Sequence, residues 1–234
     1  MVSSEPVISV ENVSISYPIR SGFIKWKKYF PLKNVSFDVY KGETVGLIGR
    51  NGAGKSSLLR MIAGIVDPDA GKIANYEVSV SLLALGVGFV PHLTGRENVI
   101  LSGMLMGMHK RDIEARMDSI IEFAGIGDFI DQPLRVYSSG MRSRISFATA
   151  IQTDPDVLLV DEVLGVGDEE FRVKSLGEMK KLIRSQKTVV LVSHQTNLIK
   201  ELCDRVVWID DGEVRFVGNT AEGLVQYGST VVKS

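Results

Sequence analysis

Apolar and polar side chains alternate along two stretches near the start of the chain, SISYP (14–18) and NVSFDVY (34–40). Such alternation is typical of strands that bury one face. The stretch ETVGLIG (43–49) is mostly apolar and leads into a glycine-rich turn, after which KSSLLRMIAG (55–64) has a helical pattern. The first third of the chain therefore predicts strands, then a strand–turn–helix unit.

Two further strands and a hairpin are predicted in the last third of the chain. DVLLVDE (156–162) and KTVVLVSH (187–194) contain short, apolar runs rich in β-branched residues, which is typical of parallel strands covered on both faces. RVVWIDDGEVRFV (205–217) predicts a hairpin, because Asp211-Gly212 suits a tight turn.

The pattern between these regions, from Asn98 to about Thr153, is helical. One apolar stripe follows the helical period, with members at Ile113, Met117, Ile120, Ile121 and Ala124. The order of strands, helical block and strands predicts an α/β core with an inserted helical subdomain. We expect the core, with an antiparallel β subdomain, to span 1–97 and 154–234, and the helical subdomain to span 98–153.

Composition narrows the class of protein. The 234 residues are 44% hydrophobic and 24% charged, with a formal net charge of -1, as in an ordinary globular protein. That balance argues against a protein whose main task is to coat nucleic acid. The run 78–95 lacks Asp, Glu, Lys and Arg, but its glycines, serines and Pro91 predict buried strand and turn rather than a membrane span. Cys203 is the only cysteine, so no internal disulfide is possible.

The stretch from Gly49 to Ser56, GRNGAGKS, fits the pattern G-x-x-x-x-G-K-[ST]. Its glycines let backbone N–H groups curl round a phosphate, and the N-terminus of the following helix points at the same place. Lys55 is expected to reach the β- and γ-phosphates and Ser56 to bind Mg²⁺. Average composition gives such a match by chance in roughly one chain in a hundred of this length, so the motif predicts a nucleotide site.

Polar residues follow two of the apolar strands. Asp161 and Glu162 end the first, and His194 ends the second. Ligands gather at the carboxyl ends of strands in an open α/β sheet. There, Asp161 can hold Mg²⁺ and Glu162 can orient or deprotonate an attacking water. A surface acidic pair and a structural histidine are the plainer alternatives.

The sequence YSSGM (137–141) opens a predicted helix, with Ser138 as its expected N-cap. Hydroxyl groups, a glycine and a helix N-terminus together favour anion binding. By itself the stretch is only a good helix cap. Within a chain that also holds a P-loop, it predicts a second phosphate-contacting segment.

Together these motifs resemble the nucleotide-binding subunits of ABC transporters over essentially the whole chain. The resemblance implies a P-loop, RecA-like core and assigns site roles. ATP-binding residues would be Tyr17, stacked on adenine, with Asn51, Gly52, Ala53, Gly54, Lys55, Ser56 and Ser57. Glu162 and His194 would be catalytic, Ser56 and Asp161 metal ligands, and Asp168 the D-loop aspartate. Ser138, Ser139 and Gly140 would contact ATP in the opposite subunit. A plain strand tyrosine is the alternative for Tyr17.

Two departures from the common pattern indicate a branch of this family. YSSGM stands where the signature usually reads LSGGQ, and no Gln occurs between Lys55 and Gln132, where the family normally has one. Ala84 falls roughly at that place. The segment LLALGVGFVPHLTGREN (82–98) instead resembles subunits that export polysaccharides of the O-antigen, capsule or teichoic-acid type.

The resemblance implies an ATP-hydrolysing motor that uses ATP and Mg²⁺ and forms a homodimer. It would drive a separate multi-span membrane permease at the cytoplasmic face of the inner membrane and export a lipid-linked polysaccharide. One alternative is a subunit for another cargo, such as a lipid or drug. A soluble ATPase acting on nucleic acid or ribosomes is a weaker alternative, because the chain has neither a long coiled coil nor a second cassette.

Two surface segments carry further hypotheses. The Met-rich stretch that includes Leu101, Met104, Leu105, Met106 and Met108 is expected to contribute to the dock for the membrane subunit, with core packing as the alternative. SGFIKWKKYF (21–30) mixes Lys25, Lys27 and Lys28 with Trp26. We expect it to be an insertion at the membrane or substrate entrance, with a solvated loop as the alternative.

Overall fold

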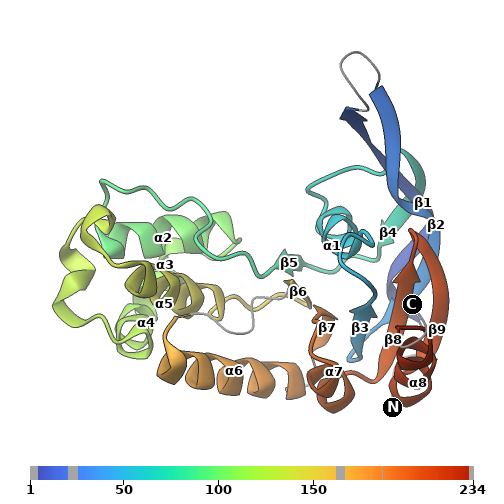
Figure 1. Ribbon diagram of the computed structural model, residues 1–234. Helices are drawn as coiled ribbons and strands as arrows, with labels where there is room; N and C mark the ends of the chain where they lie inside the picture. Colours follow the sequence, from blue (N-terminus) through green and yellow to red (C-terminus); the bar gives the residue numbers. More distant parts are fainter. Residues whose placement is uncertain (1–4, 21–25, 162–166, 186, 232–234) are drawn as a thin grey trace. The chain divides into compact units, whose positions relative to one another are not determined.

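Figure 1 shows the computed structural model, which describes residues 5–20, 26–161, 167–185 and 187–231. The chain forms two compact units, the first made of residues 1–82, 156–162 and 183–234 and the second of 83–155 and 163–182. The predicted helical segment 98–153 lies within the second unit. The chain thus leaves the first unit and returns to it twice.

The first unit contains a six-stranded sheet in the order β5-β6-β7-β3-β8-β9. Five strands are parallel, and β9 is antiparallel to β8. The strands are β3 (Thr44–Ile48), β5 (Val80–Leu82), β6 (Val157–Asp161), β7 (Thr188–Val192), β8 (Arg205–Asp210) and β9 (Glu213–Asn219). β3 and β7 are buried along their whole length, because helices cover both faces of the sheet.

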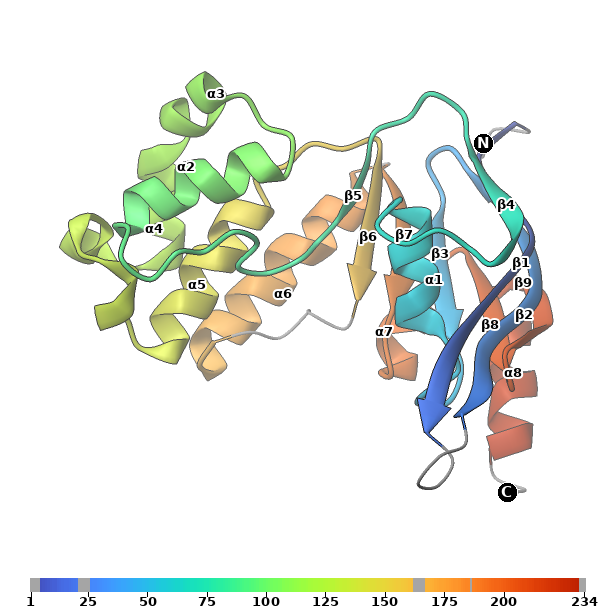
Figure 2. The ribbon, with the colours of Figure 1, turned by 90° about the horizontal axis from the view of Figure 1, so that it is seen from above.

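Helices of the first unit lie on opposite faces of this sheet. They are α1 (Lys55–Ile62), α7 (Thr196–Leu202) and α8 (Thr220–Val231). Figure 1 shows α1 above the sheet and α7 and α8 below it, and Figure 2 shows α1 lying over β7 and β3. The predicted hairpin is β8–β9, with Asp211 and Gly212 both at positive φ in its turn, as such a tight turn requires.

A three-stranded antiparallel sheet, in the order β2-β1-β4, completes the first unit. Its strands are β1 (Pro6–Arg20), β2 (Trp26–Tyr40) and β4 (Ala70–Asn75). β4 pairs with β1 only as far as Ser14, whereas β2 pairs with β1 up to Arg20. The stretch Trp26–Phe30 is therefore exposed strand rather than loop. Residues 21–25 lie outside the described residues.

The second unit is built from helices. They are α2 (Gly95–Leu105), α3 (Lys110–Ala115), α4 (Met117–Ala124), α5 (Ser139–Ala150) and most of α6 (Glu169–Arg184), with 3-10 turns η1 (Gly127–Asp131) and η2 (Leu134–Val136). The predicted apolar stripe is buried at Ile113, Met117, Ile120 and Ala124. It runs over two helices rather than one, because the chain breaks its helical course at Arg116.

Polar side chains fix the chain before α2. Thr94 and Glu97 form a capping box, and the buried Asn98 amide donates to the carbonyls of Val90, Leu93 and Thr94. The predicted strand and turn in 78–95 are present as β5 and the turns that follow it, but most of the run is partly exposed rather than buried. Within the described ranges, no helix has both the length and the hydropathy needed to span a bilayer.

Candidate nucleotide-binding site

The P-loop lies between β3 and α1, as its sequence predicts. β3 ends at Ile48, and α1 begins at Lys55. Gly52 and Gly54 adopt φ values of 80° and 90°, a region that favours glycine. A Cβ atom on Gly54 would lie 2.6 Å from the carbonyl oxygen of Pro31 in β2. The glycines therefore serve both the curvature of the loop and its close approach to β2.

The ammonium of Lys55 folds back and binds the backbone of the P-loop. Its Nζ donates hydrogen bonds of 2.9 Å to the carbonyl oxygens of Gly49 and Arg50. Only 6% of the Lys55 residue surface is exposed. Because its stem is packed and its charged end is tied to the loop, the charge lies where a phosphate in the loop would be.

Strand register brings Asp161 and His194 to the same edge of the sheet. Asp161 at the end of β6 pairs with Val192 of β7, and Val192 pairs with Leu47 of β3. His194 follows β7 by two residues and lines the P-loop cavity. Neighbouring strands are about 4.8 Å apart, so Asp161 lies two strands from the start of the P-loop. Glu162 lies outside the described residues.

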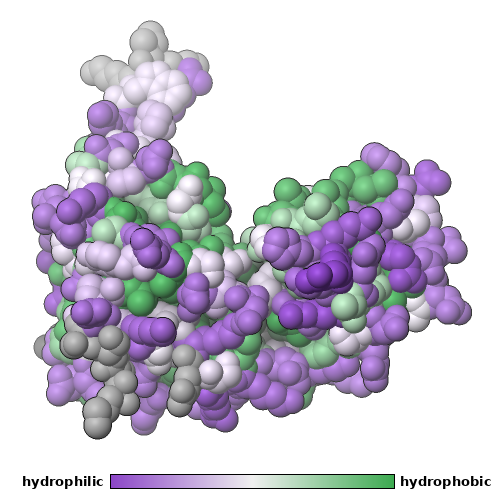
Figure 3. All heavy atoms as spheres, turned by 180° about the vertical axis from the view of Figure 1, so that it is seen from behind, coloured by the Kyte–Doolittle hydropathy of each residue, from purple (hydrophilic) through white to green (hydrophobic). Residues whose placement is uncertain are grey.

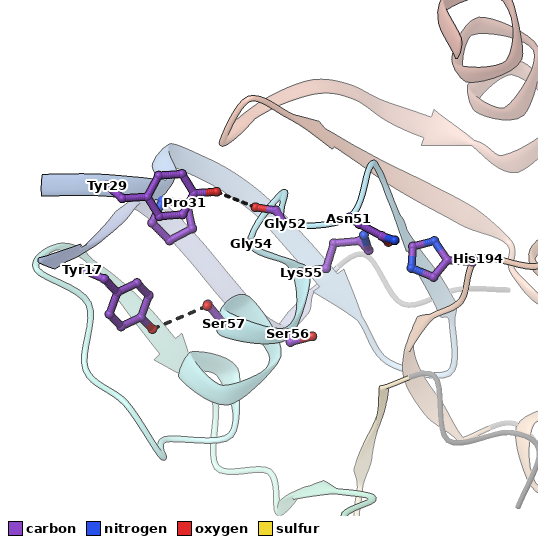
Figure 4. Close-up of a pocket in the computed structure, with 10 residues that line it drawn as sticks. All are labelled: Tyr17, Tyr29, Pro31, Asn51, Gly52, Gly54, Lys55, Ser56, Ser57 and His194. Carbon is purple, nitrogen blue, oxygen red and sulfur yellow. Dashed lines mark hydrogen bonds between the residues drawn. The ribbon is translucent and has the colours of Figure 1, made fainter. Parts of the chain in front are cut away.

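A cavity of about 500 Å³ opens beside the P-loop (Figure 4). It is lined by Tyr17, Tyr29, Pro31, Asn51, Gly52, Gly54, Lys55, Ser56, Ser57 and His194. Every residue predicted to bind ATP within one subunit contributes to it except Ala53, which lines a neighbouring cavity. Sequence reasoning missed Tyr29 and Pro31, because their place beside the loop depends on the length and register of the β1–β2 hairpin.

Two tyrosines form one wall of the cavity. Tyr17 and Tyr29 are directly opposite each other in the β1–β2 register. The hydroxyl of Tyr29 donates to the carbonyl oxygen of Gly52 at 2.8 Å, and that of Tyr17 lies 3.5 Å from Oγ of Ser57 (Figure 4). Aromatic rings beside a phosphate-binding loop offer a surface on which a nucleobase can stack.

The Ser56 hydroxyl and the Asp161 carboxylate are the predicted donors for a magnesium ion. Ser56 lines the cavity, and Asp161 is half-buried at the strand edge. Among the described residues, no cluster of three or more His, Cys, Asp or Glu side chains could cage a metal. Mg²⁺ usually takes one or two protein oxygens and completes its shell with phosphates and water, so this sparse donor set fits it.

The segment YSSGM opens α5 in the second unit, as predicted. Ser138 is the N-cap, and its Oγ accepts a hydrogen bond from the Met141 N–H at 3.1 Å. Tyr137 is buried, and burial raises the pKa of its hydroxyl to about 12. Ser139 is exposed in the first turn of the helix. The contacts expected from Ser138, Ser139 and Gly140 to a second subunit remain a prediction.

Asp168 lies at the start of α6, in the second unit. Its carboxylate accepts a hydrogen bond from the N–H of Phe171 at 3.0 Å and lies 3.8 Å from the guanidinium of Arg144. The carboxylate thus caps α6, a structural role that sequence reasoning did not assign. The D-loop role predicted for Asp168 stays a prediction.

Comparison with known proteins finds a matching family model and several similar proteins. Residues 32–165 match the family model described as "ABC transporter". "O-antigen export system ATP-binding protein RfbB" of Klebsiella pneumoniae is 41% identical over 95% of this chain and 97% of its own length. "ABC transporter protein AbcA" of Aeromonas salmonicida is 46% identical over 92% of this chain and 73% of its own.

"Teichoic acids export ATP-binding protein TagH" of Listeria innocua is 44% identical over 88% of this chain, which spans 62% of that relative's length. Among solved structures, "Dimeric structure of a post-hydrolysis state of the ATP-binding cassette MJ0796 bound to ADP and Pi" matches with a TM-score of 0.72 and 24% identity, over 91% of this chain and 98% of that one. These matches confirm the predicted P-loop α/β fold and the family resemblance. The chain belongs to the ABC transporter family.

Proposed function

We propose that this chain is the ATP-hydrolysing motor subunit of an ABC transporter that exports a lipid-linked polysaccharide across the cytoplasmic membrane. The observation that carries the proposal is the extent of its similarity to an O-antigen export ATP-binding protein, 95% of this chain and 97% of that relative. The P-loop cavity, with Lys55, Ser56 and His194 in its lining, supports the nucleotide part of the proposal.

In this proposal the chain's own groups divide the work of hydrolysis. The P-loop N–H groups and Lys55 bind the phosphates, and Glu162 orients or deprotonates the attacking water. His194 contacts the terminal phosphate. Ser56 and Asp161 hold Mg²⁺, which when bound neutralises charge on the phosphates. Tyr17 stacks on the adenine ring.

Two copies of the chain would act together. A bacterial ABC transporter cassette, 25% identical over 91% of this chain with a TM-score of 0.71, has a structure described as dimeric. We propose a homodimer in which Ser138, Ser139 and Gly140 of each copy complete the ATP site of the other, with Asp168 near the interface. The dimer would lie at the cytoplasmic face of the inner membrane, bound to a separate multi-span permease.

The ribbon formed by Tyr17–Arg20 and Trp26–Phe30 would serve at the membrane or at the substrate entrance. The exposed fractions of Trp26 and Tyr29 are 70% and 45%, and Lys27 and Lys28 are also exposed. Amphipathic aromatic rings among lysines suit a boundary between water and lipid or an anionic glycan carrier.

Genetic replacement tests the function. The gene for this chain, together with its neighbouring permease gene, would be introduced into a host that lacks its own O-antigen export pair but still makes the glycan. Glycan at the cell surface, lost in the Lys55→Ala variant, is the expected result. ATP hydrolysis by the purified chain without any glycan export would instead favour the alternative of another cargo, such as a lipid or drug.

A further inference from the structure

Tyr29 binds the P-loop backbone, and its cross-strand neighbour does not. The Tyr29 hydroxyl lies 2.8 Å from the Gly52 carbonyl oxygen, whereas the Tyr17 hydroxyl lies 3.5 Å from a side-chain oxygen on α1. A distance of 2.8 Å is usual for an O–H···O hydrogen bond, and 3.5 Å is a weak contact. The two tyrosines share a face of the hairpin, but only Tyr29 is tied to the loop.

The peptide group that Tyr29 binds is held from both sides. In a trans peptide the carbonyl of one residue and the N–H of the next point in opposite directions. The Gly52 carbonyl accepts from Tyr29, and the N–H of Ala53 donates to the carbonyl of Arg50 at 3.2 Å. The plane of the Gly52–Ala53 peptide is therefore fixed between β2 and the start of the loop.

The next residues of β2, Pro31 and Leu32, also pack against the P-loop. A Cβ on Gly54 would meet the Pro31 carbonyl oxygen at 2.6 Å and the side chain of Leu32 at 2.7 Å. Leu32 is fully buried, so its side chain is a rigid support for the P-loop. A loop with glycines at positive φ has little stiffness of its own, and its shape depends on such external contacts.

We propose that Tyr29 is a positioning residue for phosphate binding: through the Gly52 carbonyl it holds the P-loop in its phosphate-binding shape. Its ring adds a second aromatic surface beside Tyr17 at the nucleoside end of the same cavity. This inference rests on the proposed nucleotide-binding function and assigns the hairpin a part in it. The hydroxyl acts on the phosphate loop, and the two rings act on the nucleoside.

Paired hydroxyl deletions, read with two probes, test the proposal. Tyr29→Phe removes the bond to Gly52, and Tyr76→Phe makes the same chemical change at an exposed tyrosine outside the cavity lining. The probes are ATP and inorganic tripolyphosphate, which has the phosphates but no nucleoside. We expect Tyr29→Phe to weaken binding of both probes by the same factor, about 3- to 10-fold for one hydrogen bond. Tyr76→Phe should change neither by more than about twofold.

Amide hydrogen exchange gives a readout that does not depend on ligand. Tyr29→Phe should speed exchange across 49–55 while thermal unfolding stays close to that of the wild type, and Tyr76→Phe should leave exchange unchanged. Unchanged exchange, unchanged tripolyphosphate affinity, or a loss confined to ATP would each overturn the role of the hydroxyl. Failure of the wild-type chain to bind either probe would instead overturn the proposed function itself.

Discussion

The ammonium of Lys55 and the carbonyl oxygen of Gly49, at opposite ends of the P-loop, are joined by a hydrogen bond of 2.9 Å. The charge is thus held inside the loop that receives the phosphates. Lys55→Ala removes it, and charge-assisted hydrogen bonds contribute about 1.5–3 kcal/mol. We expect nucleotide affinity to fall roughly 10- to 100-fold, as measured by calorimetric titration. Lys33→Ala, at a lysine of the adjacent cavity, is the matched control and should bind normally.

Glu162→Gln should separate nucleotide binding from hydrolysis. The amide keeps the shape of the side chain but cannot accept a proton from water, so hydrolysis should fall roughly 10²- to 10⁴-fold. Nucleotide affinity should persist, because the P-loop is untouched, and the ATP-bound dimer should accumulate on size-exclusion chromatography. Glu170→Gln, at an exposed glutamate of α6, controls for the change of charge. Near-normal hydrolysis by Glu162→Gln would remove Glu162 from its role.

Replacing Lys25, Trp26, Lys27 and Lys28 together with Ala should uncouple hydrolysis from export. These changes leave Tyr29 and its bond to the P-loop intact, so the ATPase rate of the purified chain should remain within about twofold of wild type. Glycan export in cells should fall, because the exposed Trp26 ring and the charges of Lys27 and Lys28 are lost from the ribbon.

The control is a pair of changes at exposed lysines elsewhere on the same unit, Lys41→Ala and Lys200→Ala. They alter charge without touching the ribbon, so export should continue. Full export from the four-residue variant would mean that the ribbon is dispensable for transport.

Single cysteines at Met104 and Leu105 should cross-link to cytoplasmic loops of the membrane subunit. Both side chains are exposed, 51% and 57% respectively, so core packing does not explain them, and Met adapts to irregular partner surfaces. Figure 3 shows hydrophobic residues along the upper edge of this unit. The native Cys203 adds little background, because burial raises the pKa of its thiol to about 12.

Phe129→Cys, at another exposed apolar position of the same unit, supplies the comparison. Cross-links that form there as efficiently as at Met104 and Leu105, or only there, would contradict the assignment of this surface.

Asp156→Asn should destabilise the protein near neutral pH and much less in acid. The Asp156 carboxylate accepts hydrogen bonds from Oγ and N of Ser79, at 2.7 and 2.8 Å, and these bonds hold its pKa below the ordinary range. Stability from such a group is present above the unfolded pKa and is lost as pH falls through the folded pKa. The difference in Tm between variant and wild type should therefore shrink from pH 7 to pH 3.

Asp67→Asn, at another exposed aspartate of the same unit, provides the comparison. Its Tm difference from wild type should stay small at both pH values. A Tm difference for Asp156→Asn that is independent of pH would show that the carboxylate charge is not what stabilises the contact with Ser79.

Local pattern was enough to predict β3, β6, β7, the β8–β9 hairpin and the P-loop, since periodicity and glycine spacing are set by neighbouring residues. It did not predict the break at Arg116, because Ile113 and Met117 keep the helical period on either side of it. Tyr29 was missed for another reason. Its place opposite Tyr17 depends on several register shifts along β1–β2, and local sequence does not set such shifts.

The unequal pairing of β1 has an evolutionary consequence. Within the described strands, β1 beyond Ser14 pairs with β2 and not with β4, so the outer end of the ribbon can lengthen, shorten or change composition at small cost to the core. The four positions from Tyr29 to Leu32 cannot change length or composition in this way, because they contact the P-loop. Lineages with different cargoes can therefore be expected to diverge at the tip of this hairpin while its base stays fixed, and aligned insertions in related chains should begin before residue 29.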